Sequence, residues 1–349
     1  MAKERRGKER IDRGIKARTD DIFALSSGRE IAYLTLPRLA ATVFLLVLPL
    51  LLSAYWQKVL LITLTVALLA LSWDFLASVG LISLGQALFF GVGSYFAGSF
   101  SHYWGLGPLF TIPAATLAGA LFCTLLLYPV LRLRGVYFSL ITFALPLLFM
   151  RIIEATKILG GTEGLSSLPP LPGIFGELYI LIAVTLGCTF GFRRMFDTDY
   201  GLVLRAIRDN DRSVEAGGIN VQWYKSQAVF IAALPATFAG AFLTHHYQFV
   251  GMPAFAMDYS ILPLTSVVLG GAGSFAGAAV GAFILVPLSE ALRAFGTLRI
   301  VIYSIILVIF VVGLPVGVFN YLQRKYHYFE RLVPEKEGAG SGEPAGFKS

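Results

Sequence analysis

Residue types that support catalysis or metal binding are scarce in this chain. His245 and His246, two of its four histidines, are adjacent, so on a helix they would point in different directions and favour an interfacial role over a metal site. Cys123 and Cys188 lie inside apolar runs, where a thiol behaves as a small hydrophobic group. Neither His-Glu-x-x-His nor a serine in a nucleophile elbow occurs. We therefore expect no catalytic residue and no metal, and the sequence disfavours an intramembrane enzyme.

One carboxylate, Asp74, lies within an apolar run beside Trp73. An ionised side chain inside a membrane costs several kcal/mol unless it meets water or a partner. Two interpretations remain open. Asp74 could belong to a functional site, or it could take part in hydrogen bonding at a helix end, with Arg132 or Arg134 as its partner.

The segment 193–225 interrupts the apolar pattern with six basic and five acidic residues. These charges nearly cancel, which argues against a simple polybasic lipid anchor. Asp209 or Asn210 could cap a short helix that runs to Glu215, and the pair Gly217–Gly218 would end it. Such a helix could dock into a groove on another protein, or it could be a solvated loop helix with no partner.

The elements that position these residues follow from composition. Of the 349 residues, 56% are hydrophobic and 14% are charged, and the mean hydropathy is +0.72. Because about a quarter of an average soluble domain is charged, we predict an all-α, polytopic transmembrane helix bundle. Spans of roughly 20 residues would number about 8–10, with Gly-rich broken or re-entrant helices among them. The candidate spans are 37–55, 59–79, 84–101, 109–131, 136–155, 177–193, 226–248, 259–270, 274–294 and 299–319.

The basic residues favour one orientation of this bundle. If the amino terminus is cytoplasmic and every candidate span crosses, 23 of the 28 Lys and Arg residues lie on the cytoplasmic side, as the positive-inside rule expects. The net charge of +7 is then a marker of topology, and no nucleic-acid partner is expected. The predicted organisation is a basic cytoplasmic tail (1–36) that could meet membrane lipid, a transmembrane domain (37–320) with a cytoplasmic loop (193–225), and a disordered cytoplasmic tail (321–349).

Two segments rich in glycine indicate either close packing or a translocation path. Glycine lets membrane helices approach closely, and it also permits helix breaks where protein or a watery cavity satisfies the backbone. Paired breaks of this kind are typical of a path through the membrane. The predicted path residues are Asp74, Ser83, Gly85, Gln86, Gly91, Gly93, Tyr95, Gly270, Gly271, Gly273 and Ser274.

The polar loop also carries a family pattern. Residues 206–211 read Ala-Ile-Arg-Asp-Asn-Asp, and residues 218–220 read Gly-Ile-Asn. Apart from Asp209 and Asp211, where Glu is usual, this pattern resembles the coupling loop of ABC importer permeases of the branched-chain amino acid type. The resemblance implies that the loop docks on an ATPase through Arg205, Ile207, Arg208, Asp209, Asn210, Asp211, Glu215, Gly218 and Asn220.

Four further stretches resemble the same family in its order, which extends the likeness from about residue 59 to 320. They are residues 80–95, 132–138, 159–165 and 268–274. The third resembles the family's Gly-rich outer loop, which implies a surface for a binding protein at Gly160, Gly161, Thr162 and Gly164. The long basic amino terminus and the Arg-Gly-Val-Tyr-Phe segment are more similar to the LivM-type half of these importers than to the LivH-type half.

The resemblance implies a permease that carries branched-chain amino acids, or a related amide or urea, across the inner membrane of a bacterium or archaeon. Its implied partners are a homologous second permease, two ABC ATPase subunits and an extracytoplasmic solute-binding protein. Because no Gly-x-x-x-x-Gly-Lys-Ser/Thr pattern is present, we expect ATP to be used by the partner subunits, with no cofactor bound by this chain. The alternative is an ion-coupled secondary transporter, which would leave the 193–225 loop unexplained.

Overall fold

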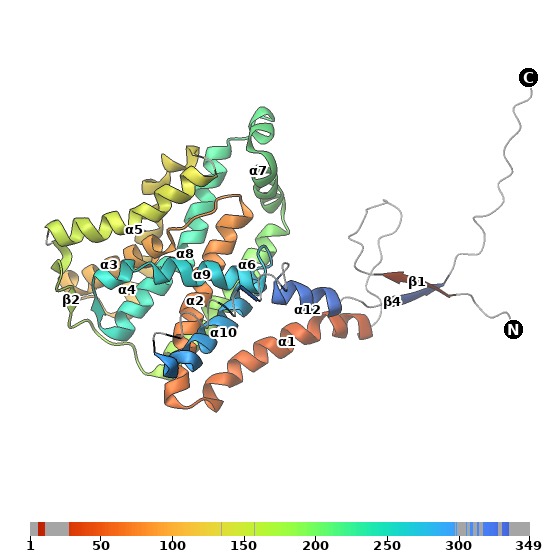
Figure 1. The fold of residues 1–349 in the computed structure, drawn as a ribbon, viewed down its shortest axis with the longest axis horizontal. Coiled ribbons are helices and arrows are strands. Elements are labelled where there is room, and N and C mark those ends of the chain that lie inside the picture. Colours follow the sequence, from red (N-terminus) through yellow and green to blue (C-terminus); the bar gives the residue numbers. More distant parts are fainter. Residues whose placement is uncertain are drawn as a thin grey trace, which may run out of the picture.

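The computed structural model describes residues 6–10, 28–133, 135–156, 158–296, 298, 305, 308–309, 313, 317–326 and 330–334. Over these residues the chain forms a helical bundle with two short two-stranded sheets (Figure 1). Six helical segments are long and apolar enough to cross a membrane. The all-α membrane bundle predicted from composition is therefore confirmed.

The helices follow the apolar runs of the sequence. They are α1 (Gly28–Leu51), α2 (Ala54–Ser78), α3 (Gln86–Trp104), α4 (Pro108–Leu127), α5 (Val136–Thr156), α6 (Ile174–Phe196), α7 (Asp199–Ala216), α8 (Val221–Tyr247), α9 (Asp258–Gly270), α10 (Ala276–Ala291) and α12 (Val318–Tyr326). The 3-10 turns are η1 (Val130–Arg132), η2 (Ile158–Gly160), η3 (Met252–Phe255) and η4 (Leu292–Phe295). Most of the candidate span 299–319 lies outside the described residues.

The short candidate span 259–270 gains its length from the residues before it. Helix α9 joins η3 to give one apolar segment, Met252–Gly270, which is among the six candidate spans. The Gly-rich candidate span 84–101 forms α3, an unbroken helix that begins at Gln86 after a non-helical connection. The interruption that glycine predicted there thus precedes the helix.

Two pairs of strands complete the described structure. Strand β1 (Arg6–Arg10) pairs antiparallel with β4 (Glu330–Pro334), and β2 (Leu165–Ser166) pairs antiparallel with β3 (Phe249–Val250). The tail predicted to be disordered from residue 321 is helical up to Tyr326 and extended in β4. At these residues the structure differs from the prediction, since α12 continues past residue 321 and contacts α9 and α10.

Helices α2 and α8 form the centre of the bundle. Within their most apolar stretches, 94% of the α2 residues and 78% of the α8 residues are buried, against 22% in α5. An apolar helix without a polar face is typical of such all-round burial. The outer faces of α1, α4 and α5 carry exposed Leu, Phe and Val side chains, which suit contact with lipid or with a neighbouring subunit.

Glycines set the closest helix crossings. A Cβ at Gly93 of α3 would overlap the carbonyl of Thr237 in α8, and a Cβ at Gly240 of α8 would overlap the carbonyl of Phe90 in α3. Gly270 of α9 approaches the backbone of α10 in the same way. Small residues at such crossings let membrane helices gain packing contacts.

The connections between helices gather at two ends of the bundle. At the α7 end, cavities beside α7 are bordered by residues 78–81, Leu133, Gly135 and residues 273–275. At the β2–β3 end, the connection from 158 to 173 pairs with residues 248–256, and Figure 1 shows β2 far from α7. This division matches the predicted topology, in which the connections of the first group share one side of the membrane.

Candidate functional site

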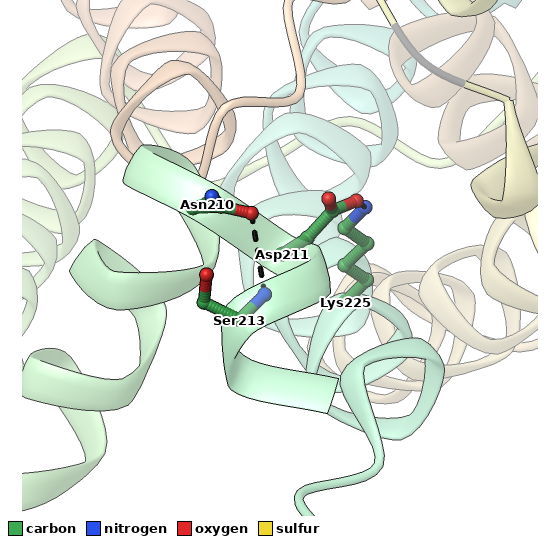
Figure 2. A network of polar contacts seen from close by, with 4 residues as sticks. All are labelled: Asn210, Asp211, Ser213 and Lys225. Atoms are coloured by element: carbon green, nitrogen blue, oxygen red, sulfur yellow. Dashed lines mark hydrogen bonds and ion pairs between the residues drawn. The ribbon is translucent and has the colours of Figure 1, made fainter. Parts of the chain in front are cut away.

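Helix α7, which gives the α7 end of the bundle its name, is divided into two helical parts at Asn210. Its backbone has helical geometry on both sides of this residue, which itself has φ −159° and ψ 97°. The Oδ1 atom of Asn210 accepts a hydrogen bond from the Ser213 backbone N–H at 3.2 Å (Figure 2). The sequence predicted a cap at Asp209 or Asn210, and the structure assigns it to Asn210. The helical run before Asn210, which begins at Asp199, was missed.

The first part of α7 is anchored by apolar side chains. Leu204 and Ile207 are buried, and Gly201 packs directly on the backbone of Phe196. The three-residue spacing from Leu204 to Ile207 is the amphipathic signal that could have predicted this earlier start. Tyr200 is held against the Tyr224 ring of α8, with 5.7 Å between ring centroids. Burial, followed by the proximity of Tyr224, raises the pKa of Tyr200 to about 12, so its phenol stays neutral at physiological pH.

Several residues predicted to contact an ATPase also contact the bundle, although Arg205 and Arg208 remain exposed. Arg205 donates a hydrogen bond to the Phe196 carbonyl and its guanidinium lies 6.0 Å from the centroid of that ring. Arg208 lines both cavities beside α7. Asp211 forms an ion pair with Lys225 at the start of α8. Docking of these residues on an ATPase stays a prediction, and the structure adds the contacts that each of them makes within the chain.

The exposed side of α7 contains the remaining predicted docking residues and one that was missed. Leu202 is 65% exposed, an unusual state for a leucine on a polar helix. Asp209 and Glu215 are also exposed, while Gly218 has φ +83° with open space around its Cα. Asn220 caps α8 by accepting the Trp223 backbone N–H at 3.0 Å. Leu202 marks the outward side of α7, and a single exposed leucine does not by itself define an interface.

The carboxylate of Asp74 accepts hydrogen bonds from the non-helical turn between α9 and α10. Its Oδ1 accepts the Gly273 backbone N–H at 2.6 Å and its Oδ2 accepts the Phe275 backbone N–H at 3.0 Å. These donors lie just before the first turn of α10, where an anion is favoured. The cation that interacts with Asp74 is Arg208 of α7. Of the two interpretations left open, hydrogen bonding at a helix end describes this geometry, with backbone N–H groups as partners; of the predicted partners, Arg134 lies outside the described residues.

The turn that Asp74 holds contains a second cap. Gly271 and Gly273 have positive φ values of 111° and 80°, which only glycine adopts readily. Ser274 donates its hydroxyl to the Gly271 carbonyl at 3.0 Å and accepts the Gly277 backbone N–H at 3.0 Å. Side chains of Asp74 and Ser274 thus make hydrogen bonds to four backbone groups of the break.

Two cavities separate α7 from the bundle. One, of about 430 Å³, lies between residues 79–81, the residues Leu133, Gly135 and Phe138, and the inner side of α7. The other, of about 390 Å³, lies between the end of α6, α7 and the 273–275 turn. Because Arg208 borders both, α7 is held by specific side-chain contacts and is not packed continuously against the bundle.

The predicted path residues of the first glycine segment are buried in packing contacts. The Ser83 carbonyl accepts the Trp73 indole N–H at 2.6 Å, and Gln86 accepts the Ser72 hydroxyl at 3.1 Å. Side chains or backbone of neighbouring elements fill the space beside Gly85, Gly91 and Gly93. The Nε2 atom of Gln86 and the hydroxyl of Tyr95 are buried without a hydrogen-bond partner among the described residues. Close packing therefore describes these glycines directly, while their role in a path stays a prediction.

The loop predicted to face a binding protein lies at the β2–β3 end. Gly160, Gly161 and Gly164 all have positive φ, and Thr162 is exposed. A Cβ at Gly164 would overlap the Val250 carbonyl, so this glycine lets the loop reach β3.

The adjacent histidines at the end of α8 contact different groups, as their spacing predicted. His245 Nδ1 is 2.9 Å from the Pro169 carbonyl, and His246 Nδ1 is 2.5 Å from Glu177 Oε2. These contacts join α8 to the 158–173 connection and to α6. Over the described part of the chain, no group of three or more His, Cys, Asp or Glu side chains is arranged to hold a metal ion.

Comparison with known proteins gives consistent matches. A family model described as a branched-chain amino acid transport system permease component matches residues 55–322. The high-affinity branched-chain amino acid transport system permease protein LivM of Escherichia coli is 27% identical over 299 residues, covering 76% of this chain and 68% of that protein. Its counterpart in Salmonella typhimurium is 28% identical over 271 residues, covering 68% and 63%.

A more distant match comes from Methanocaldococcus jannaschii. Its probable branched-chain amino acid transport permease protein LivM is 26% identical over 186 residues, which are 51% of this chain and 54% of that protein. The chain therefore spans between about half and two thirds of the length of these relatives. No solved structure matches the chain.

Proposed function

Because this chain belongs to the family of branched-chain amino acid transport permease components, we propose that it is the membrane permease of an ATP-driven importer for branched-chain amino acids or a related small solute. Its relatives are named for that transport. The solute range, the partner subunits and the orientation in the membrane are parts of this proposal. The chain is a multi-pass membrane protein, and we place the α7 end on the cytoplasmic side.

The observation that carries the proposal is that α7 is anchored to the bundle on one side and exposed on the other. Its inner side is fixed by Leu204, Ile207 and the Asp211–Lys225 ion pair, while Leu202 and the acidic residues beyond it face outward. A helix held in this way can dock into a groove on a second protein and transmit force to the bundle. An ATPase subunit is the partner that the permease family implies.

The remaining partners follow from the same proposal. A homologous second permease would cover part of the exposed apolar surface of α4 and α5, with lipid covering the rest. An extracytoplasmic solute-binding protein would meet the loop at Gly160–Gly164, which is at the β2–β3 end, opposite α7. ATP would be bound by the two ATPase subunits and not by this chain.

An ion-coupled secondary transporter fits less well. Such a protein would use an intramembrane acid to bind a coupling ion. Both carboxylate oxygens of Asp74, the acid at this depth, are engaged by backbone N–H groups of the 273–275 turn. The ion-coupled reading also leaves α7 without a role.

Copurification of an ABC ATPase tests the proposal. Leu202→Asp places a charge at the centre of the proposed docking surface, and we expect the amount of copurified ATPase to fall about tenfold, which corresponds to the loss of about 1.4 kcal/mol of binding. Tyr103→Asp is the matched control, because Tyr103 is similarly exposed but lies at the end of α3 distant from α7. Equal copurification with both variants, or an ATPase that never binds the unmodified chain, would contradict the proposal.

A further inference from the structure

The second part of α7 is a separate capped turn. Asn210 departs from helical geometry, and its side-chain oxygen accepts a hydrogen bond from the Ser213 backbone N–H. A new helical segment therefore begins at residue 211 (Figure 2). The part before the break is anchored to the end of α6 through Gly201. The part after it can therefore follow a different element.

That element is α8. Asp211 Oδ2 lies 3.2 Å from Lys225 Nζ, and Figure 2 shows the two side chains directed towards each other from neighbouring helices. The Lys225 side chain is only 9% exposed and the Asp211 side chain 17%. An ammonium group removed from water to this degree depends strongly on its counterion. The pair thus fixes the position of the 211–216 turn relative to the first turns of α8.

The environment of the pair contains other charges. Arg208, Asp209 and Arg212 line the same 430 Å³ cavity as Asp211 and Lys225. These additional charges belong to α7, whereas Lys225 is the charged residue that α8 contributes to this lining. Among the residues that line this cavity, Lys225 is therefore the cation through which α8 is bound electrostatically to α7.

Helix α8 connects this pair with the far side of the bundle. It runs from Val221 to Tyr247 and packs closely on α3 at Thr237 and Gly240. At its other end, His245 and His246 contact Pro169 and Glu177. A displacement of the first turns of α8 would accordingly reach the 158–173 connection through one continuous helix.

We propose that the Asp211–Lys225 ion pair is a link through which movement of α7 is transmitted to α8, and through α8 to the β2–β3 end, in addition to the 217–220 connection and the Tyr200–Tyr224 ring contact. This inference rests on the proposed function, since it assigns a mechanical role within the same importer. Asp211 and Lys225 act as positioning residues, because neither is required to touch the ATPase or the solute. A pair that served stability alone would be needed for folding but not for the ratio of transport to ATP hydrolysis.

The test compares three variants in the complex of the chain with its ATPases and binding protein. Lys225→Met removes the cation while keeping the length of the side chain. The exchange of both charges, Asp211→Lys with Lys225→Asp, restores an ion pair of opposite direction. Arg151→Met is the matched control, because Arg151 forms an ion pair with Glu154 at 2.7 Å but is 72% exposed and lies on α5. The quantity measured is solute taken up per ATP hydrolysed in proteoliposomes, normalised to assembled complex.

We expect Lys225→Met to hydrolyse ATP while its uptake per ATP falls about fivefold or more, the lower range of a typical coupling between sites. The exchanged pair should recover part of that loss, and Arg151→Met should match the unmodified protein. The inference is overturned if uptake per ATP is unchanged in Lys225→Met, or if uptake and hydrolysis fall together in proportion to the amount of assembled complex. An unmodified complex without ATP-dependent uptake would instead refute the proposed function.

Discussion

The two ends of the bundle are held together by different kinds of contact. At the α7 end, charged side chains reach between elements: Asp211 to Lys225, and Asp74 to the backbone of the 273–275 turn. Two cavities lie among these contacts. Elements at this end are therefore joined by these polar contacts and by the apolar anchors Leu204 and Ile207, with cavities between them.

At the β2–β3 end the contacts are made mainly by backbone. Leu165 pairs with Val250 and Ser166 with Phe249, and Gly164 fits against the Val250 carbonyl. The His245 contact to the Pro169 carbonyl again involves backbone. The difference indicates that movement can begin at the α7 end, whereas the β2–β3 end responds as one closely fitted unit.

The largest effect is expected at Asp74. Asp74→Leu leaves two N–H groups of the 273–275 turn without an acceptor, which should lower the free energy of unfolding by about 3 kcal/mol or more. Asp74→Asn, which keeps one carbonyl oxygen, should lose about half as much. Unfolding by SDS titration in mixed micelles measures both. A Leu variant as stable as the unmodified protein would show that this carboxylate does not hold the break.

The next effect tests the close fit of the β2–β3 end. Gly164→Ala should lower the free energy of unfolding by about 2–4 kcal/mol, because it combines left-handed backbone strain with overlap of the Val250 carbonyl. Gly105 also has a positive φ, +65°, in the left-handed region, but open space around it. Gly105→Ala should therefore lose only the strain, about 1–2 kcal/mol. Equal losses at the two glycines would remove the argument for close packing at this end.

A smaller effect is expected for the contact between Glu177 and His246 at the β2–β3 end. Glu177→Gln weakens the hydrogen bond to His246 without breaking it, at a cost of about 1 kcal/mol. Its uptake per ATP should equal that of the unmodified protein, in contrast to Lys225→Met. If Glu177→Gln uncouples transport as strongly, the mechanical difference between the two ends is refuted.

The smallest effect sets the baseline. Arg151→Gln removes an exposed ion pair and should change the free energy of unfolding by about 0.5 kcal/mol or less. The same SDS titration measures it. A larger loss would mean that Arg151 is covered in the assembled protein.

Much of the fold follows from the sequence because each span depends on its own residues. The apolar runs of α2 and α8 are long enough to be recognised without knowledge of their neighbours. The cap at Asn210 and the end of α7 at the glycine pair were also predictable, since both depend on local side-chain chemistry. The division of α7 at Asn210 was not, because it depends on the anchoring of its two parts to different helices.

The candidate site was only partly predictable for the same reason. Asp74 stood out as an acid in an apolar run, but its partners are 199 and 201 residues away along the chain. Leu202 is exposed because α7 meets the bundle through Gly201, Leu204 and Ile207, a choice of face that the sequence does not specify. A glycine in the sequence does not reveal which of two structural roles it has. Gly93 permits a close helix crossing, whereas Gly273 permits a turn with positive φ.

The central claim, that this permease works with ATPases bound at α7, is tested most directly by uptake of labelled leucine into proteoliposomes that contain the complete complex. We predict uptake that requires ATP on the α7 side, persists when proton and sodium gradients are dissipated, and is lost with Leu202→Asp. Uptake that follows an ion gradient without ATP would contradict the account.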